Sequence, residues 1–299
     1  MAYRATHEIL STHYWDITAD ALHAYRTAIE KNLSQRIAYV APEHRTDLPF
    51  MLSSSTDFKE RLYVKNYDWC YPENFDKDDQ VINVVRIYGG VLRNGDACSY
   101  GSIDHRDLMR RASDDKHCIG HIIIANTPGG SAYSKYDYEE AVEYAHSKGK
   151  PVIGLVEGMA CSAGYAAMAL CDECYSDGLH NIVGCIGTMM AGYMQKDGDV
   201  NAVTQERYIE MVASQSPDKN LEYRNLAADD RAMVQAELDR LCAEFQATVK
   251  KYRPQVKDEQ LTGKTYDSGT VVGSLIDGIG TIDLCVSRVQ DLYKKQNKH

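Results

Sequence analysis

The chain has 299 residues, of which 44% are hydrophobic and 25% charged, a composition typical of a soluble globular protein with one large domain or one domain plus an extension. The formal net charge of -10, without any basic run, argues against a nucleic-acid-binding surface. No run of about 18 apolar residues and no signal segment occur, so neither membrane association nor secretion is expected. Nine irregularly spaced cysteines favour reduced thiols in the cytoplasm over a disulfide framework.

Residues 1–80 are expected to form an N-terminal extension. Within it, apolar residues at helical spacing predict a helix over 15–33, with Asp16 or Thr18 as its N-cap. Residues 37–80 are polar and interrupted by prolines, and no element is predicted there.

A different pattern begins at Val81, where short apolar runs alternate with helical periodicity. This order predicts an α/β protein with mostly parallel strands, and the continuously apolar strands predict a sheet covered on both faces. Strands are expected within 81–91, 121–130, 151–158, 173–177 and 182–190, and helices within 105–112, 136–148, 162–171 and 228–251.

Ser162 is the first candidate for chemistry. It follows a buried apolar run and opens a helix of small residues, where free backbone N–H groups can stabilise an oxyanion. Taken alone, this position favours an ordinary helix N-cap. The surrounding residues do not form the G-x-S-x-G turn of α/β hydrolases.

Two further motifs flank this serine in the chain. N-T-P-G-G at 126–130 ends an apolar run in two glycines, where backbone can approach another chain closely. The N–H groups of Gly129 or Gly130 are candidate oxyanion donors, together with that of Ala163. The third motif, G-C-I-G-T-M-M, ends at residue 190.

The succession N-T-P-G-G, M-A-C-S-A and G-C-I-G followed by two methionines resembles the signal peptide peptidase A family of serine peptidases. The similarity is greatest to its branch of phage head-maturation proteases, and it covers roughly residues 81–290. It implies a ClpP/crotonase-like ββα spiral core in residues 81–299. It also implies a serine endopeptidase with a Ser-Lys dyad and without cofactor or metal.

The resemblance also implies a setting. The protein would form a homo-oligomeric ring, act on protein or peptide substrates, and process capsid or scaffold proteins. It would be cytoplasmic, in a bacterial host or a phage prohead, with no nucleic-acid or membrane partner.

Lys219 is the lysine whose position matches that of the family base. It lies 57 positions after Ser162, in a short polar stretch before the long helix expected at 228–251. Burial would lower its pKa enough for it to accept the serine proton. Composition alone favours a surface lysine there. Lys196 and Lys264, which is expected to start a C-terminal strand, are the alternatives.

Departures from the family pattern keep other functions open. Thr127 replaces a serine, and Ala163 replaces a glycine. Cys185 stands where the family has a serine that can hydrogen-bond the lysine, and a thiol is a poorer partner. Cys185 is therefore a possible lysine-orienting residue and also the main argument for a catalytically degenerate assembly or scaffold protein. An acyl-CoA enzyme of the crotonase type is a further alternative.

Other cysteines are given structural roles. Cys171 and Cys174 form C-x-x-C without a second pair, so no metal site is predicted. Cys161, next to Ser162, is expected to pack in the core.

Overall fold

The structure is a computed structural model that describes residues 14–34, 48–63, 78–95, 100–191, 196–201 and 205–297. Its N-terminal part corrects one expectation. The helix predicted from residue 15 begins later, as α2 (Ala19–Ser34), and the preceding residues form a strand, β1 (Trp15–Ile17). Asp16 is therefore a strand residue and not a helix cap. Tertiary pairing of β1 overrides the local helical periodicity.

A nine-stranded sheet forms the core of the described chain, in the order β10-β9-β7-β5-β4-β2-β3, with β8 pairing with β7 and β11 with β8. The central strands β4 (Val81–Tyr88), β5 (Cys118–Thr127) and β7 (Val152–Cys161) are parallel, as predicted. The remaining strands of this sheet are β2 (Phe50–Ser53), β3 (Arg61–Tyr63), β8 (Glu173–Ser176), β9 (Ile182–Gly184), β10 (Thr265–Asp267) and β11 (Gly278–Ile279). Thus β2 and β3, from the first 80 residues, extend the same sheet.

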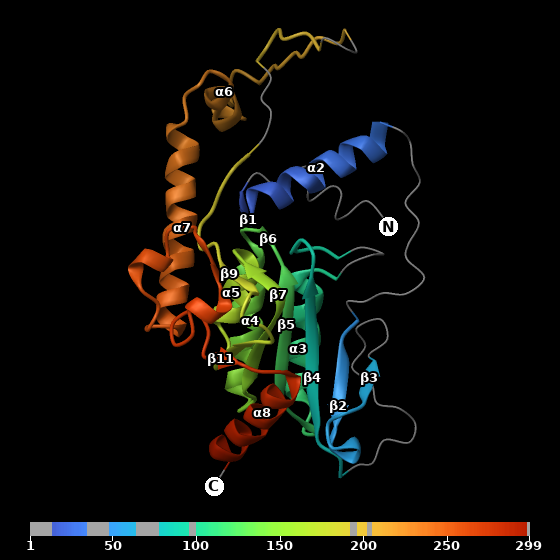
Figure 1. The fold of residues 1–299 in the computed structure, drawn as a ribbon. Helices are drawn as coiled ribbons and strands as arrows, with labels where there is room; N and C mark the ends of the chain where they lie inside the picture. The colour runs from blue at the N-terminus through green and yellow to red at the C-terminus, as the bar shows by residue number, and fades with distance from the viewer. Residues whose placement is uncertain are drawn as a thin grey trace.

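Helices cover the sheet on both faces, which confirms the expectation from its continuously apolar strands (Figure 1). On one face α3 (Ser102–Asp114) and α4 (Ser134–Ser147) pack over side chains such as Val85. On the other, α8 (Ile282–Gln296) packs over side chains such as Ile82. The 3-10 turns are η1 (Ser54–Thr56), η3 (Asp258–Gln260) and η4 (Ser268–Thr270).

Strand β7 divides its pairing between two neighbours. Its first part, Ile153–Val156, pairs with β8, and its last three residues, Met159–Cys161, pair with β9. Gly158 lies between the two parts with φ +93°, a conformation that glycine adopts easily. The sheet therefore forks, and the carboxyl end of β7 emerges between β5 and β9.

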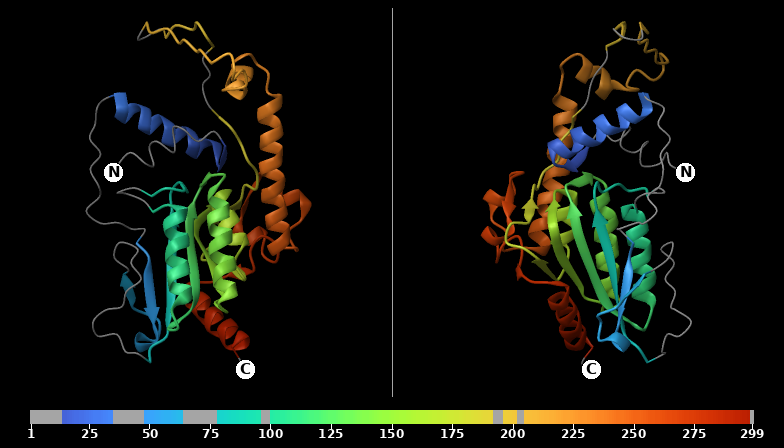
Figure 2. Two further views of the ribbon diagram at one scale, coloured as in Figure 1. Left: turned by 180° about the vertical axis from the view of Figure 1, so that it is seen from behind. Right: turned by 45° about the vertical axis from the view of Figure 1, so that its right-hand side comes forward.

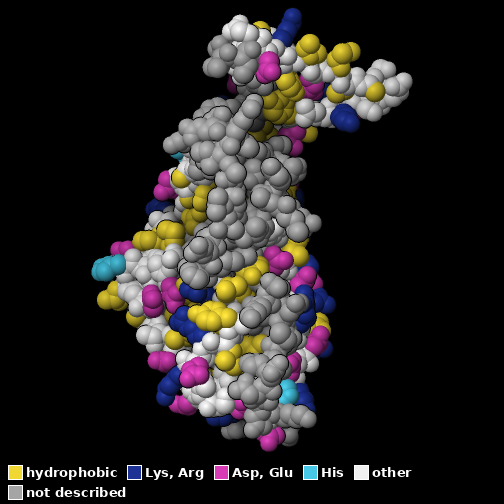
Figure 3. All heavy atoms as spheres, turned by 90° about the vertical axis from the view of Figure 1, so that its right-hand side faces the viewer, with side chains coloured by type: hydrophobic (Ala, Val, Ile, Leu, Met, Phe, Trp, Pro, Cys, Tyr) yellow, Lys and Arg dark blue, Asp and Glu magenta, His cyan; other side chains and the backbone are white. Residues whose placement is uncertain are grey.

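The segment before the long helix projects from this core as an arm, which we define as residues 196–201 and 205–230. It includes α6 (Leu221–Ala227) and leads into α7 (Ala232–Tyr252), whose C-terminal half returns to the core through Phe245 and Val249. Both views in Figure 2 place the arm away from the sheet. Ile209 and Met211 of the arm are 67% and 90% exposed, and hydrophobic side chains lie open at the top of Figure 3.

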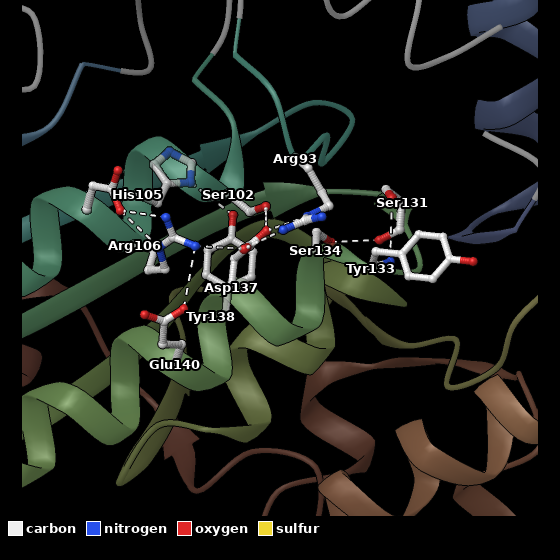
Figure 4. Close-up of polar contacts among 11 residues, drawn as sticks. Arg93, Ser102, His105, Arg106, Ser131, Tyr133, Ser134, Asp137, Tyr138 and Glu140 are labelled. Atoms are coloured by element: carbon white, nitrogen blue, oxygen red, sulfur yellow. Dashed lines mark hydrogen bonds and ion pairs between the residues drawn. The ribbon is translucent and has the colours of Figure 1, made fainter. Parts of the chain in front are cut away.

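A buried carboxylate joins the elements around the short strand β6 (Gly129–Ser131). The side chain of Asp137, on α4, accepts hydrogen bonds from Arg93 at 2.9 and 3.0 Å and from Ser102 at 2.6 Å (Figure 4). One turn earlier, the Ser134 hydroxyl donates to the carbonyl of Ser131 at 2.7 Å. These bonds fix the start of α4 against α3 and against the end of β6.

Close packing also joins β5 to α5 (Ala163–Ala169). A Cβ atom on Gly164 would lie 2.3 Å from the methyl carbon of Thr127, closer than two carbon atoms can approach. The Thr127 hydroxyl donates to the carbonyl of Gly89 at 2.5 Å, which holds the side chain in place. Glycine is thus required at 164 while threonine occupies 127.

We expect Gly164→Ala to lower the free energy of unfolding by about 2 kcal/mol through this steric overlap. Thr127→Ser removes the methyl group, so the double variant should recover at least half of that loss. Urea denaturation of the wild type, both single variants and the double variant measures the coupling. Strictly additive effects of the two substitutions would contradict this account of the packing.

Candidate active site

Ser162 lies at the turn that joins β7 to α5, at the carboxyl end of the forked strand. Its side chain is fully buried. Its N–H donates to the carbonyl of Gly184 at 2.8 Å, one residue beyond the β7–β9 pairing. Its hydroxyl donates to the carbonyl of Gly187 at 3.3 Å. These bonds tie the serine to the last residue of β9 and to the segment that follows it.

The backbone of Ser162 has φ +54° and ψ -118°, which is rare for a residue with a side chain. Such a conformation costs roughly 1–3 kcal/mol and persists where surrounding structure enforces it. The Ser162 side chain makes no capping bond to the helix. The ordinary N-cap interpretation therefore does not explain this serine.

The two glycines of the N-T-P-G-G motif differ in their bonding. The Gly129 N–H donates to the Thr127 hydroxyl at 3.1 Å, so it is engaged within the turn. A Cβ atom on Gly129 would lie 2.9 Å from Cβ of Ser162, so this backbone adjoins the serine. Gly130 follows in β6, and Ala163 follows the serine as the first residue of α5.

Cys185 also adjoins the serine, from the segment after β9. Burial raises the pKa of the Cys185 thiol, and a hydrogen bond with the Ser162 side chain offsets part of that rise. The neighbouring Cys161 is fully buried, and burial raises its pKa to about 12. Its sulfur faces the carbonyl of Ile182 at 3.9 Å, in keeping with the packing role expected for it.

The structure does not bring a predicted lysine to Ser162 within one chain. Lys219 is exposed on the arm, immediately before α6, which Figure 1 shows far from the turn between β7 and α5. Lys196 is exposed on the same arm, and Lys264, just before β10, is exposed as well. The Lys264 carbonyl accepts the N–H of Cys185 at 2.7 Å, which places the backbone of Lys264 beside the site.

Strand β1 lies in the space beside these residues and pairs on two sides. It is antiparallel to β6, with Trp15 opposite Ser131 and Ile17 opposite Gly129. On its other edge, Trp15 and Met189 exchange two backbone hydrogen bonds of 2.9 and 2.8 Å. Strand β1 thus lies between β6 and Met189, with Asp16 and Ile17 opposite the two glycines Gly130 and Gly129.

The central residue of β1 carries a buried charge that sequence reasoning missed. Asp16 is fully buried, accepts a hydrogen bond from the Thr188 hydroxyl at 2.6 Å, and lies 3.8 Å from the Lys135 ammonium. Burial raises the pKa of Asp16 to about 6, while Lys135 and Thr188 act against that rise.

Lys135 is itself only 3% exposed, and burial lowers its pKa. Its ammonium donates to the carbonyl of Leu241 on α7 at 3.1 Å. Lys135 follows the glycine motif by five residues, which is the one sequence signal that would have drawn attention to it.

Other expectations concern metals and membranes. Within the described ranges no three His, Cys, Asp or Glu side chains come together as metal ligands. Cys171 and Cys174 are buried, and burial raises the pKa of Cys174 to about 12. Over the same ranges, none of the helices has the length and apolarity needed to cross a bilayer.

Comparison with known proteins gives a family match. The sequence profile described as "Peptidase family S49" matches residues 144–296, about half of the chain. Protease 4 of Haemophilus influenzae is 25% identical over 222 residues, which are 72% of this chain and 35% of that protein. The chain thus spans about a third of the length of this relative.

Solved structures resemble the fold. An enoyl-CoA hydratase/isomerase family protein from Silicibacter pomeroyi matches with a TM-score of 0.39 and 17% identity, over 72% of this chain and 78% of that one. A mutant of the 1510-N membrane-bound stomatin-specific protease matches with a TM-score of 0.39 and 15% identity, over 69% and 82%. The strand pairing confirms the predicted α/β class with parallel central strands, independently of these similarities.

The raised pKa of Asp16 predicts a pH effect on stability. Protonation stabilises the folded chain at this residue, so the contribution is complete below about pH 4 and is lost as the pH rises through about 6. As the pH falls from 7 to 4, the free energy of unfolding of the wild type should therefore increase by on the order of 2 kcal/mol relative to that of Asp16→Asn.

Urea denaturation of both proteins over this pH range measures the difference, and other titrating groups cancel in the comparison. A difference in stability that does not change with pH would contradict the burial of an ionisable Asp16.

Proposed function

Since the chain belongs to peptidase family S49, the signal peptide peptidase A-like serine peptidases, we propose that it is a serine endopeptidase with Ser162 as its nucleophile. The observation that carries this proposal is the geometry of Ser162. A fully buried serine, held at positive φ and making no helix cap, costs free energy that ordinary packing does not require. Ser162, Gly129 and Cys185 each belong to a different one of the three motifs that resemble the family, and the three residues lie side by side.

The proposed reaction is acyl transfer. A neutral Lys219 takes the proton of Ser162, and Oγ attacks the peptide carbonyl. The N–H groups of Ala163 and of Gly129 or Gly130 stabilise the oxyanion. In the isolated chain the Gly129 N–H is engaged by Thr127, and Gly130 pairs with Asp16 of β1. Lys219 then protonates the leaving amine, and water hydrolyses the acyl-enzyme.

We further propose that Lys219 reaches Ser162 of a neighbouring copy in a ring. Within one chain this lysine is exposed on the arm, away from the serine (Figure 1). The same arm exposes Ile209 and Met211, and apolar side chains of this size favour burial against another protein surface. In the proposed ring, a neighbouring protomer would supply both that surface and the serine to which Lys219 is delivered.

The biological role that we propose is the processing of capsid or scaffold proteins in a phage or prophage. The M-A-C-S-A string and the two methionines after G-C-I-G support the phage branch of the family. Fold alone does not specify a substrate, so this role rests on the motif resemblance.

One observation favours a second function, a degenerate assembly protein. The side chain beside Ser162 after β9 is the thiol of Cys185, where the family has a hydroxyl that can orient the lysine. A chain that kept the fold and the arm but lost the chemistry would keep assembling without hydrolysing peptides.

Labelling with a fluorophosphonate, followed by intact-mass spectrometry, tests the dyad. The wild type should gain one adduct, Ser162→Ala none, and Lys219→Ala should label at least about 100-fold more slowly. Lys196→Ala, a lysine on the same arm, is the matched control and should label like the wild type.

Mixing Ser162→Ala with Lys219→Ala tests the shared site. After dissociation and reassembly at equal amounts, labelling should return to about a quarter of the wild-type level, because half of the intact serines then have a neighbour with an intact lysine. No recovery in properly assembled mixtures would place the base in the same chain. A folded wild type that never labels would favour the degenerate assembly protein.

A further inference from the structure

We propose that Lys135 and Thr188 form a subsite for an acidic side chain of an extended peptide, and that β1 occupies this cleft in the manner of a substrate through Asp16. This inference rests on the proposed peptidase function and names the class of peptide that the site accepts.

The backbone of β1 is bound as a peptide strand is bound in a cleft. Its residues pair with β6 on one edge, and Trp15 pairs with Met189 on the other. At the ends of the segment, the Thr18 N–H donates to the carbonyl of Pro128 at 3.0 Å, and the Tyr14 carbonyl accepts from Ala132 at 3.3 Å. Backbone pairing of this kind binds an extended segment regardless of its side chains.

The position of Asp16 relative to Ser162 indicates which residue of a bound peptide would have its side chain recognised. The carbonyl oxygen of Asp16 and Cβ of Ser162 both face the point that a Cβ atom on Gly129 would occupy, at 2.2 and 2.9 Å. A main-chain carbonyl of β1 thus lies where the nucleophile and the glycine backbone meet. Asp16 is therefore the residue of β1 whose carbonyl adjoins the nucleophile.

The side chain of Asp16 points into a polar pocket with one positive charge. One carboxylate oxygen accepts the Thr188 hydroxyl at 2.6 Å, and the other has no hydrogen-bond partner but lies 3.8 Å from the Lys135 ammonium. Lys135 is held by the carbonyl of Leu241 at 3.1 Å and is almost completely buried. Burial raises the pKa of a carboxyl group in this pocket, but Lys135 and Thr188 oppose that rise. A buried ammonium without a close carboxylate is costly, so an occupant whose carboxylate offsets the Lys135 charge should bind better than one with a carboxamide.

The flanking side chains of β1 add apolar contacts on the opposite face. Trp15 and Ile17 are buried against Leu92 and Met189. The occupant that fits this cleft is therefore an extended segment with an acidic residue between two large apolar residues, the pattern that β1 itself presents.

Peptide binding to the full chain with Ser162→Ala tests the subsite without catalysis. The probe is a fluorescent heptapeptide with the sequence of residues 13–19, and its matched control carries Asn in place of Asp16. A second substitution, Asp16→Lys, places two ammonium groups together and should release β1; Asp16→Ala serves the same purpose if the lysine variant does not fold.

Fluorescence anisotropy should show that releasing β1 tightens binding of the Asp peptide at least tenfold. The Asp peptide should then bind at least tenfold more tightly than the Asn peptide, and Lys135→Met should abolish this preference. Equal binding of the two peptides to a folded β1-release variant would overturn the acidic subsite. Binding that does not improve on release would overturn the occupancy by β1.

These outcomes are independent of the labelling experiment. If Ser162 reacts with a fluorophosphonate neither in the wild type nor in Asp16→Lys, but the Asp preference and its loss in Lys135→Met are found, the cleft binds acidic peptides and only the peptidase activity fails. If Ser162 reacts and no preference is found, the peptidase proposal stands and the acidic subsite is wrong.

Discussion

The divided pairing of β7 is the constraint on which the site depends. A strand has two edges, and one edge of β7 is shared by β8 and β9 in succession while the other pairs with β5. The strand must bend between the two partners, and Gly158 allows this at φ +93°. The N–H of Ser162 continues the ladder to β9, so the serine is fixed at positive φ by main-chain bonds rather than by its own preference.

The same fork leaves two backbone edges facing each other, β6 and the segment after β9. Buried N–H and carbonyl groups without partners cost free energy, so the space between these edges favours an extended chain. Strand β1 fills it, although residues 15–17 continue the helical periodicity of α2. The pairing partners lie more than a hundred residues away, which explains why the local pattern predicted a helix there.

The elements that were predicted well from the sequence are those specified by the pattern of hydrophobic residues over a short stretch of chain. The apolar runs of β4, β5 and β7 and the periodicity of α4 and α7 depend on neighbouring residues only. Each element is present at its predicted place in the chain, and only the residues at which it begins and ends differ. The serine and glycine motifs are likewise local, and the structure brings Ser162 and Gly129 together. Lys135 was missed because its burial depends on α7, which begins almost a hundred residues later. Lys219 was chosen by its place in chain order, and order does not determine distance when the intervening arm leaves the core (Figure 1).

The arm and β1 are physically linked. The two events proposed above, delivery of Lys219 by a neighbouring copy and release of β1 from the cleft, are therefore not independent. The Tyr14 hydroxyl donates to Glu222 of α6, and the buried Tyr14 packs against Leu241 of α7. Lys219 precedes α6 on this same arm. In an isolated chain the cleft is filled and the lysine is distant. If a neighbouring copy held the arm in another position, the contacts that Tyr14 makes with Glu222 and Leu241, next to β1, would change. Since a partner shifts an equilibrium only through contacts that differ between its states, this bond is the structural connection by which assembly could favour release of the strand.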